Sequence, residues 1–406
     1  MSTPENKPPA VMLPVAGVSL AAISCGIKKN ASTDLVLISF DESASCAATF
    51  TQNAFCAAPV TLAKKHMSQS PARALLINSG NANAGTGETG MQNAEQSCVW
   101  LAQELSCSAE QILPFSTGVI GQQLPMDKMQ SGISSISDGL SEDNWSVAAE
   151  GIKTTDTVAK TISRSLVLNG KAVTINGIAK GSGMICPNMA TMLSFIATDA
   201  NIESSFLQQC LSEAVTDSFN AITVDGDTST NDACVLIASG KAGNEQLMAE
   251  SEDVSIFIEA LNEVCQHLAH AIIRDAEGAT KFVTISVKQA QSKAEARDVA
   301  YTVAHSPLVK TALFASDANW GRILAAVGRA NIENLDINGV NLYLDDVCIV
   351  SNGGVDSAYT EEQGAAVMVQ KDITITIELS RGDEAVDIWT SDLSHEYVRI
   401  NAEYRT

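Results

Sequence analysis

The sequence has few basic residues, few aromatic residues and no long apolar run. Only 25 of the 406 residues are Lys or Arg, against 47 Asp and Glu, and the formal net charge is −22. A surface that follows nucleic-acid phosphates needs clustered Lys and Arg, so we expect no nucleic-acid partner. No stretch approaches the roughly 20 apolar residues of a membrane span, so we expect no membrane partner.

Paired cysteines and a signal peptide are also missing. None of the ten cysteines belongs to a CxxC motif, and residues 1–9 are polar, without the apolar core of a secretory signal. Most cysteines sit among small apolar residues, as a reduced, buried thiol does. We therefore expect a cytoplasmic protein without a disulfide framework.

Three patterns resemble cofactor or metal sites, but each lacks an essential residue. Residues 225–232 alternate oxygen side chains as a calcium loop does, yet the sixth-position glycine and twelfth-position Glu are missing. The glycine-rich residues 80–87 lack the Gly-Lys-Ser/Thr ending of a phosphate loop. His267 and His270 have no evident third ligand. We expect no cofactor and no metal, and interpret 225–232 as a polar loop that supports the site.

Apolar periodicity predicts the fold class. Residues 91–105, 206–215 and 261–272 carry apolar residues at helical spacing, whereas 34–40, 74–77, 283–287 and 373–377 are typical of strands. Asn169-Gly170 predicts a hairpin between 166–168 and 173–175, and Asn338-Gly339 a turn between 335–337 and 340–342. Mixed helices and hairpins favour a layered α+β fold with mixed or antiparallel sheets. The Ser-, Gly- and Asp-rich residues 131–145 are predicted to be an exposed connection.

The segment 180–199 is the most unusual chemically. Glycines and a proline precede Ala190-Thr191, and 192–196 is typical of a buried strand. A Thr hydroxyl needs a base to act as a nucleophile, and no histidine lies in this segment. Cleavage of the preceding peptide bond would free an α-amino group, with a pKa near 8, to accept the hydroxyl proton. A structural Thr in a strand is the simpler reading of the residue taken alone.

Residues 180–193, KGSGMICPNMATML, resemble the signature of the glutamate N-acetyltransferase (ornithine acetyltransferase) family. Further blocks similar to that family follow in the same order along nearly the whole chain: 49–60, 78–85, 116–121, 154–157, 220–232, 275–281, 316–322 and 401–406. The resemblance implies an N-terminal-nucleophile-like fold that cleaves itself between Ala190 and Thr191. It implies an N-terminal chain 1–190, a C-terminal chain 191–406 and a heterotetramer of two of each.

The resemblance also implies the roles of individual residues. Thr191 is the expected nucleophile, and Thr117 and Gly118 are expected to form the oxyanion hole. The family's substrate-binding positions correspond to Thr154, Lys180, Thr191, Glu277, Asn401 and Thr406. We expect Lys180 to hold a substrate carboxylate and Glu277 to pair with the ornithine side-chain ammonium.

The expected reaction carries acetyl from N-acetylornithine to Thr191 and then to glutamate, by a ping-pong mechanism. Acetyl-CoA stays open as an alternative donor. Two rival functions remain on the sequence alone. An N-terminal-nucleophile hydrolase such as an aminopeptidase would pass the acyl group to water, and a non-enzymatic binding protein with this fold would show no processing.

Overall fold

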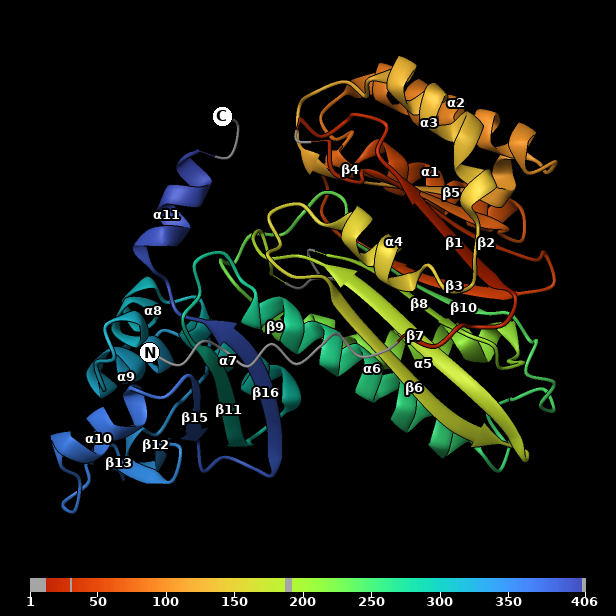
Figure 1. Ribbon diagram of the computed structural model, residues 1–406. Coiled ribbons are helices and arrows are strands. Elements are labelled where there is room, and N and C mark those ends of the chain that lie inside the picture. The colour runs from red at the N-terminus through yellow and green to blue at the C-terminus, as the bar shows by residue number, and fades with distance from the viewer. Residues whose placement is uncertain (1–11, 30, 187–191, 404–406) are drawn as a thin grey trace. The chain divides into compact units, whose positions relative to one another are not determined.

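The computed structural model describes residues 12–29, 31–186 and 192–403 (Figure 1). Its contacts divide the chain into two compact units. The first unit contains residues 1–181, 187–220 and 228–272, and the second contains 182–186, 221–227 and 273–406. The two units are thus not consecutive stretches of sequence, because short segments on either side of residue 191 alternate between them.

The described strands of the first unit form two sheets. The four-stranded sheet has the order β1 (Val18–Ile23), β2 (Leu35–Phe40), β4 (Ala74–Asn81) and β5 (Ile112–Val119). The five-stranded sheet has the order β3 (Ser45–Phe50), β10 (Ala233–Ala238), β8 (Leu193–Thr198), β7 (Lys171–Lys180) and β6 (Lys160–Leu168). Pairing is antiparallel except for β4 with β5 and β8 with β10.

A continuous apolar core joins these two sheets. Alternate residues of β2 face opposite sides, so Val36 and Ile38 enter the core between the sheets while Leu35 and Leu37 face helices. Phe115 of β5 meets Phe195 of β8 edge to face, with ring centroids 5.3 Å apart. Every residue of β8 and β10 is buried, so both faces of these strands are covered, and their residues are apolar except Ser194 and Thr198.

Helices cover the outer faces of the two sheets, and one further helix, α4 (Trp145–Ile152), packs in the core between them (Figure 1). Those on the four-stranded sheet are α1 (Ala58–Gln69), α2 (Gly87–Glu104) and α3 (Met126–Ile136). Those packed with the five-stranded sheet are α5 (Ser204–Thr216) and α6 (Val254–Arg274). Gly177 of β7 leaves room for Val264 and Leu268, because an added methyl group would lie within 3 Å of both.

The second unit is built on one seven-stranded mixed sheet. Its described strands run in the order β14 (Gly354–Val355), β13 (Val347–Ser351), β12 (Asn341–Leu344), β15 (Asp372–Glu378), β11 (Phe282–Ala290), β16 (Glu384–Ser391) and β9 (Ile222–Thr223). Its helices are α7 (Lys293–Ala304), α8 (Pro307–Phe314), α9 (Trp320–Val327), α10 (Glu361–Met368) and α11 (His395–Ala402). Helix α7 packs on β11 and β16.

The layered α+β class with mixed and antiparallel sheets is confirmed. The predicted helices correspond to α2, α5 and α6, and the hairpin at Asn169-Gly170 joins β6 to β7. The predicted exposed connection 131–145 is wrong. Residues 131–136 belong to α3, and Ile133, Ile136 and Trp145 are buried in the apolar core. Residues 335–337 form no strand, since the turn at Asn338 is a single 3-10 turn that leads into β12.

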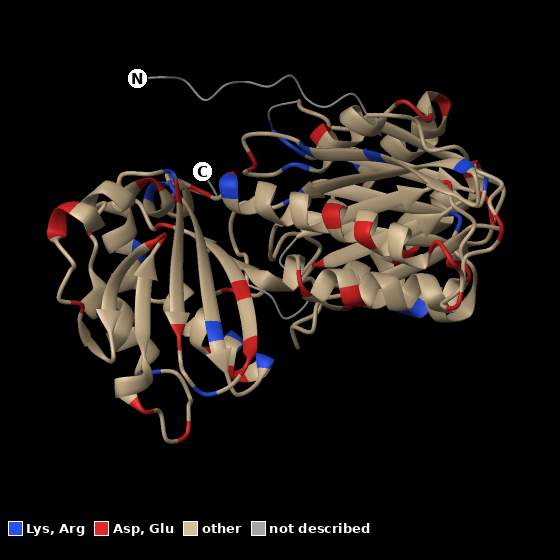
Figure 2. Ribbon diagram, turned by 90° about the horizontal axis from the view of Figure 1, so that it is seen from below, with Lys and Arg blue, Asp and Glu red and all other residues tan. Residues whose placement is uncertain are grey.

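All ten cysteines are free; four are buried and six are partly exposed, so fewer are buried than predicted. In the described part of the chain, no helix is long and apolar enough to cross a membrane. Figure 2 shows Asp and Glu spread over helices, strands and loops, with fewer Lys and Arg among them. The negative charge is therefore a general property of the surface.

Candidate functional site

The start of β8 lies directly after the predicted nucleophile, and three neighbouring strands meet there. Leu193 pairs with Lys180, the last residue of β7, and on its other side with Ala233, the first residue of β10. Asp232 precedes Ala233, whose backbone nitrogen donates to Met192 O at 3.1 Å. The sheet thus holds a lysine on one side of the β8 start and a buried aspartate on the other.

Thr117 and Gly118 lie near the end of β5, an edge strand of the other sheet in the first unit. Gly80 opposes Gly118, and the register of β4 with β5 shifts between Gly80 and Asn81. Thr117 is 8% exposed, and its hydroxyl makes no hydrogen bond with any residue that the structure describes. A hydroxyl that bonds to no described residue can donate its proton to a ligand oxygen.

The side-chain amide of Asn231 links the end of β5, where the predicted oxyanion residues lie, to the start of β10. Asn231 Nδ2 donates to Ser116 O at 3.0 Å and to Ala82 O at 2.6 Å, and Thr230 donates its hydroxyl proton to Asn231 Oδ1 at 2.6 Å. Asn231 neighbours Asp232 in sequence, so Thr117, Gly118, Lys180 and the β8 start belong to one region of the first unit.

Replacing Gly118 with alanine should disrupt this region. Its φ of +132° disfavours any side chain, and a methyl group would overlap Gly80 and lie 2.5 Å from the Asn81 nitrogen. We expect Gly118→Ala to lower kcat at least about a hundredfold, the scale for loss of one oxyanion donor. The control is Gly121→Ala, where φ is +81° but nothing lies within 4 Å. Equal steady-state activity of the two variants would remove Gly118 from the site.

Asp156 joins two predicted substrate-binding positions. Its carboxylate accepts hydrogen bonds from Thr154 N at 2.9 Å, Gly181 N at 2.7 Å and Lys160 Nζ at 2.6 Å. Burial alone would raise the pKa of Asp156, but the charges of Lys160 and Lys180 and these hydrogen bonds hold it below its ordinary value. Asp156 is therefore ionised and fixes the Thr154 loop against the end of β7.

In the second unit, Asp225 holds the segment before the predicted cleavage site. Its carboxylate accepts hydrogen bonds from Met184 N at 2.7 Å, from Ile185 N at 3.0 Å and from the Tyr397 hydroxyl at 3.0 Å. Val224 N also donates to Ile185 O at 2.8 Å. The predicted supporting role of loop 225–232 is consistent with these contacts: Asp225 fixes the segment before the junction, and Asp232 borders the segment after it.

Glu277 and Asn401 meet within the second unit. Asn401 Nδ2 donates to Glu277 Oε2 at 2.8 Å, and Glu277 N donates to Ser182 O at 2.8 Å. Gly183 permits this approach, because an added methyl group would lie 2.5 Å from the Glu277 carboxyl carbon. Glu277 is 9% exposed, so little water reaches its carboxylate. The attraction between this carboxylate and a bound cation is stronger there than at the protein surface.

The loop after Glu277 is fixed by Asp392. Its carboxylate accepts hydrogen bonds from Thr280 N at 2.8 Å, Lys281 N at 3.0 Å and the Thr280 hydroxyl at 2.6 Å. Ser394 then donates to Gly278 O at 2.7 Å. Two residues just after β16 thereby position the loop that follows Glu277.

One histidine does approach the segment before Thr191. His305 Nε2 lies 3.5 Å from Cys186 Sγ and 3.0 Å from the Thr223 hydroxyl, which itself donates to Ile185 O. Burial raises the pKa of the Cys186 thiol to about 11. The thiol is therefore protonated at neutral pH, and this pair is not an activated Cys–His nucleophile.

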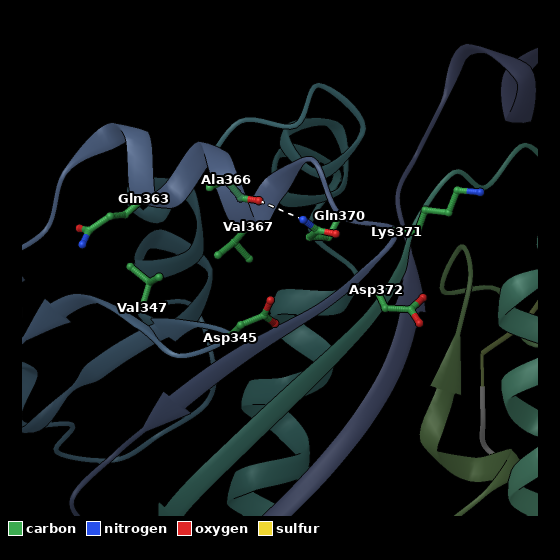
Figure 3. Close-up of a pocket in the computed structure, with 8 residues that line it drawn as sticks. All are labelled: Asp345, Val347, Gln363, Ala366, Val367, Gln370, Lys371 and Asp372. Atoms are coloured by element: carbon green, nitrogen blue, oxygen red, sulfur yellow. Dashed lines mark hydrogen bonds between the residues drawn. The ribbon is translucent and has the colours of Figure 1, made fainter. Parts of the chain in front are cut away.

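A hollow of about 840 Å³ also lies in the second unit (Figure 3). It is lined by residues of α10 and by the ends of β12, β13 and β15, including Asp345, Gln363 and Asp372. None of the predicted site residues lines it. Within the described ranges, no group of three or more His, Cys, Asp and Glu side chains is arranged to hold a metal ion.

The structure thus places the predicted residues in two sets. Thr117, Gly118, Thr154 and Lys180 belong to the first unit, and Glu277 and Asn401 to the second. Ala190, Thr191 and Thr406 lie outside the described residues. Sequence reasoning assigned no individual role to Asp156, Asp225 or Asp232. Their presence within the blocks 154–157 and 220–232 was the available signal.

A family model and curated relatives match this sequence over nearly the full chain. The model of the ArgJ family matches residues 19–406. "Arginine biosynthesis bifunctional protein ArgJ" of Pseudomonas fluorescens is 55% identical over 97% of each chain, and the protein of that name from Methylococcus capsulatus is 53% identical over 97% of each. A crystal structure of arginine biosynthesis bifunctional protein argJ from Bacillus halodurans is 42% identical, with a TM-score of 0.51, over 53% of this chain and 100% of that chain.

Proposed function

Because this chain belongs to the ArgJ family, we propose that it is a self-cleaving acetyltransferase of arginine biosynthesis. Its substrates are N-acetylornithine, which gives acetyl to Thr191, and glutamate, which takes it. The products are ornithine and N-acetylglutamate. The observation that carries this proposal is that residue 191 lies two positions before a buried central strand, β8, with Lys180 at the end of one flanking strand and Asp232 just before the other.

Cleavage after Ala190 leaves the fold supported on both sides of the break. Residues 182–186 are held by Asp225, Val224 and Glu277 through hydrogen bonds within the second unit. Strand β8 pairs with β7, from the N-terminal fragment, and with β10, from the C-terminal fragment. Since β10 also pairs with β3, one sheet combines strands of both fragments, and we expect them to stay associated.

The length of the Bacillus halodurans chain supports this division. A C-terminal fragment that begins at Thr191 contains 216 of the 406 residues, or 53% of the chain. The solved chain is matched over its whole length by the same share, 53%, of this sequence. A single-chain relative of full length would be matched by nearly all of it, as the curated relatives are.

In the mature enzyme, the freed α-amino group of Thr191 accepts the hydroxyl proton. Its ordinary pKa near 8 suits a base at neutral pH. The hydroxyl oxygen attacks the acetyl carbonyl carbon, and the negative charge that forms on the carbonyl oxygen is met by the Thr117 hydroxyl and the Gly118 backbone. Each such donor contributes about 3–4 kcal/mol to the transition state. Ornithine leaves, and the amine of glutamate then attacks the acetyl ester.

Charge complementarity supports the assignment of the substrate groups. Lys180, whose neighbour Gly181 donates a backbone hydrogen bond to Asp156, is a point charge for the α-carboxylate that both amino-acid substrates carry. Glu277, oriented by Asn401, suits the side-chain ammonium of ornithine. Thr154 and Thr406 complete the proposed binding set. We expect two fragments of each kind to form a heterotetramer in the cytoplasm, where the ten thiols stay reduced.

Product analysis tests the proposal. Purified protein is given acetyl-labelled N-acetylornithine, with and without glutamate, and labelled N-acetylglutamate and free acetate are quantified. Transfer to glutamate must exceed release of acetate. Acetate as the main product with glutamate present indicates a hydrolase instead, and an uncut, inactive chain indicates a binding protein. A parallel incubation with acetyl-CoA and glutamate decides whether acetyl-CoA is a second donor.

Glu277→Gln should weaken N-acetylornithine binding selectively. The amide oxygen can still accept from Asn401, but the negative charge is lost, and a charge-assisted hydrogen bond contributes about 1.5–3 kcal/mol. We expect KM for N-acetylornithine to rise about 10- to 100-fold, while glutamate remains an efficient acceptor. The matched control is Glu396→Gln on α11, whose carboxylate pairs with Arg399 at the surface. An unchanged KM in Glu277→Gln would remove this residue from the ornithine site.

A further inference from the structure

Asp232 is a buried acid beside the predicted cleavage site that the proposed reaction does not yet use. It is 4% exposed, and its carboxyl group accepts a hydrogen bond from the backbone N–H of Met192, the residue that follows Thr191. Ser229 donates to the same carboxyl group from its hydroxyl and its backbone nitrogen. The backbone pairing of Ala233 with Leu193 fixes the position of the Asp232 backbone beside Met192.

The environment favours the protonated form of this acid. Burial raises the pKa of Asp232 well above its ordinary value, more than the hydrogen bonds and the charge of Lys180 lower it. Lys180, at the end of β7, is the cation that faces it. That lysine also acts on Asp156 and Lys28, and Asp156 pairs with Lys160. The negative charge of Asp156 offsets the charges of Lys180 and Lys160. Asp232 can therefore stay protonated without leaving these lysines uncompensated.

We propose that Asp232 supplies the proton that the Thr191 nitrogen takes up when the chain cleaves itself. This inference rests on the proposed cleavage at Thr191. The Thr191 oxygen adds to the Ala190 carbonyl carbon, the carbon–nitrogen bond breaks, and the nitrogen receives the Asp232 proton. The proton of the hydroxyl group returns to the Asp232 carboxylate, so the acid is regenerated. Water then hydrolyses the ester, which leaves a carboxylate on Ala190 and the hydroxyl on Thr191.

An amide nitrogen is a poor leaving group unless it is protonated, and this step therefore needs an acid at that position. A positioned general acid typically contributes about 10²–10⁴ in rate. In the described part of the chain, Asp232 is the carboxyl group that bonds to the backbone at Met192.

The test follows cleavage of the full-length chain made by cell-free translation with a short labelling pulse. The fraction of uncut chain is measured against time on denaturing gels over a pH series, for the wild type, Asp232→Asn, Asp232→Glu and Thr191→Ala. Asp227→Asn is the matched control, an acid-to-amide change at an exposed position in the same loop. Asparagine mimics the neutral acid in shape but donates no comparable proton, and circular dichroism with thermal unfolding checks that each variant folds.

We expect Asp232→Asn to slow cleavage at least a hundredfold, Asp232→Glu to recover part of the rate, and Asp227→Asn to match the wild type. The wild-type rate should fall as pH rises, because the protonated acid is the active form. Folded Asp232→Asn that cleaves at the wild-type rate overturns the proposal for Asp232 alone. So does a wild-type rate that is flat or rises with pH, which decides the matter even if Asp232→Asn does not fold. A wild-type chain that never cleaves contradicts the proposed function itself.

Discussion

A Thr191→Ala chain is expected to remain a single polypeptide of 406 residues and to lose acetyl transfer. The same hydroxyl attacks the Ala190 carbonyl during maturation and the acetyl carbonyl during turnover, so one substitution removes both reactions. We expect kcat to fall by at least about a thousandfold, since what remains without a nucleophile is binding and oxyanion stabilisation. Denaturing gels report the cleavage, and the N-acetylornithine-to-glutamate assay reports the transfer.

Two further variants separate chemistry from folding in this experiment. Thr191→Ser keeps a hydroxyl and should still cleave and transfer, more slowly than the wild type. Thr216→Ala removes an exposed threonine at the end of α5 and should behave as the wild type in both assays. Full transfer activity in uncut Thr191→Ala protein would show that the acetyl group never resides on this residue.

The largest effect on stability is expected at Asp156. Asp156→Asn removes the carboxylate from Lys160, whose side chain is only 1% exposed, and weakens the anchors of Thr154 and Gly181. Breaking a buried ion pair by removing one partner costs about 3–5 kcal/mol. We expect a loss of that size in the free energy of unfolding, measured by denaturant titration with circular dichroism, together with a raised KM for both amino-acid substrates.

The pH dependence of unfolding checks the same interaction. Because the pKa of folded Asp156 lies below its unfolded value near 3.9, its contribution is present above that pH and is lost as pH falls further. The wild type should therefore lose stability on acidification more steeply than Asp156→Asn. The matched control is Asp41→Asn, whose pair with Lys241 is solvent-exposed and should contribute less than about 1 kcal/mol. Equal losses in the two variants would contradict the account of Asp156 as a buried ionised node.

The spacing of apolar residues was sufficient to predict the elements that have one buried and one exposed face. Helix α6 buries the predicted Leu261, Cys265, Leu268 and Ile272, and the Asn-Gly turn between β6 and β7 lies where the sequence indicates. The prediction of an exposed connection at 131–145 was wrong because the many Ser, Gly and Asp residues of this segment obscure a short helical face. Met129, Ile133 and Ile136 recur at helical spacing and pack on β2 and α2. Helix α3 has too few turns for the composition of this segment to reveal the helix.

The sequence named the candidate site residues that the family resemblance assigns. It did not name the residues that only strand pairing brings to the site. Lys180 and Asp232 are far apart in the sequence and come to lie on either side of the β8 start only because β7 and β10 both pair with β8. Asp156 is one acid among 47 Asp and Glu, and its importance arises from three donors that converge on it in the fold. Periodicity reports which side of an element is buried, but it does not report which buried polar groups meet.

Intact mass spectrometry of the purified protein after brief exposure to N-acetylornithine, without glutamate, tests the central claim most directly. The account predicts two polypeptides, 1–190 and 191–406, with one acetyl group on the terminal threonine of the second and its loss when glutamate is added. An active protein that is continuous through residues 190 and 191, or an acetyl group that never appears on the C-terminal fragment, would contradict it.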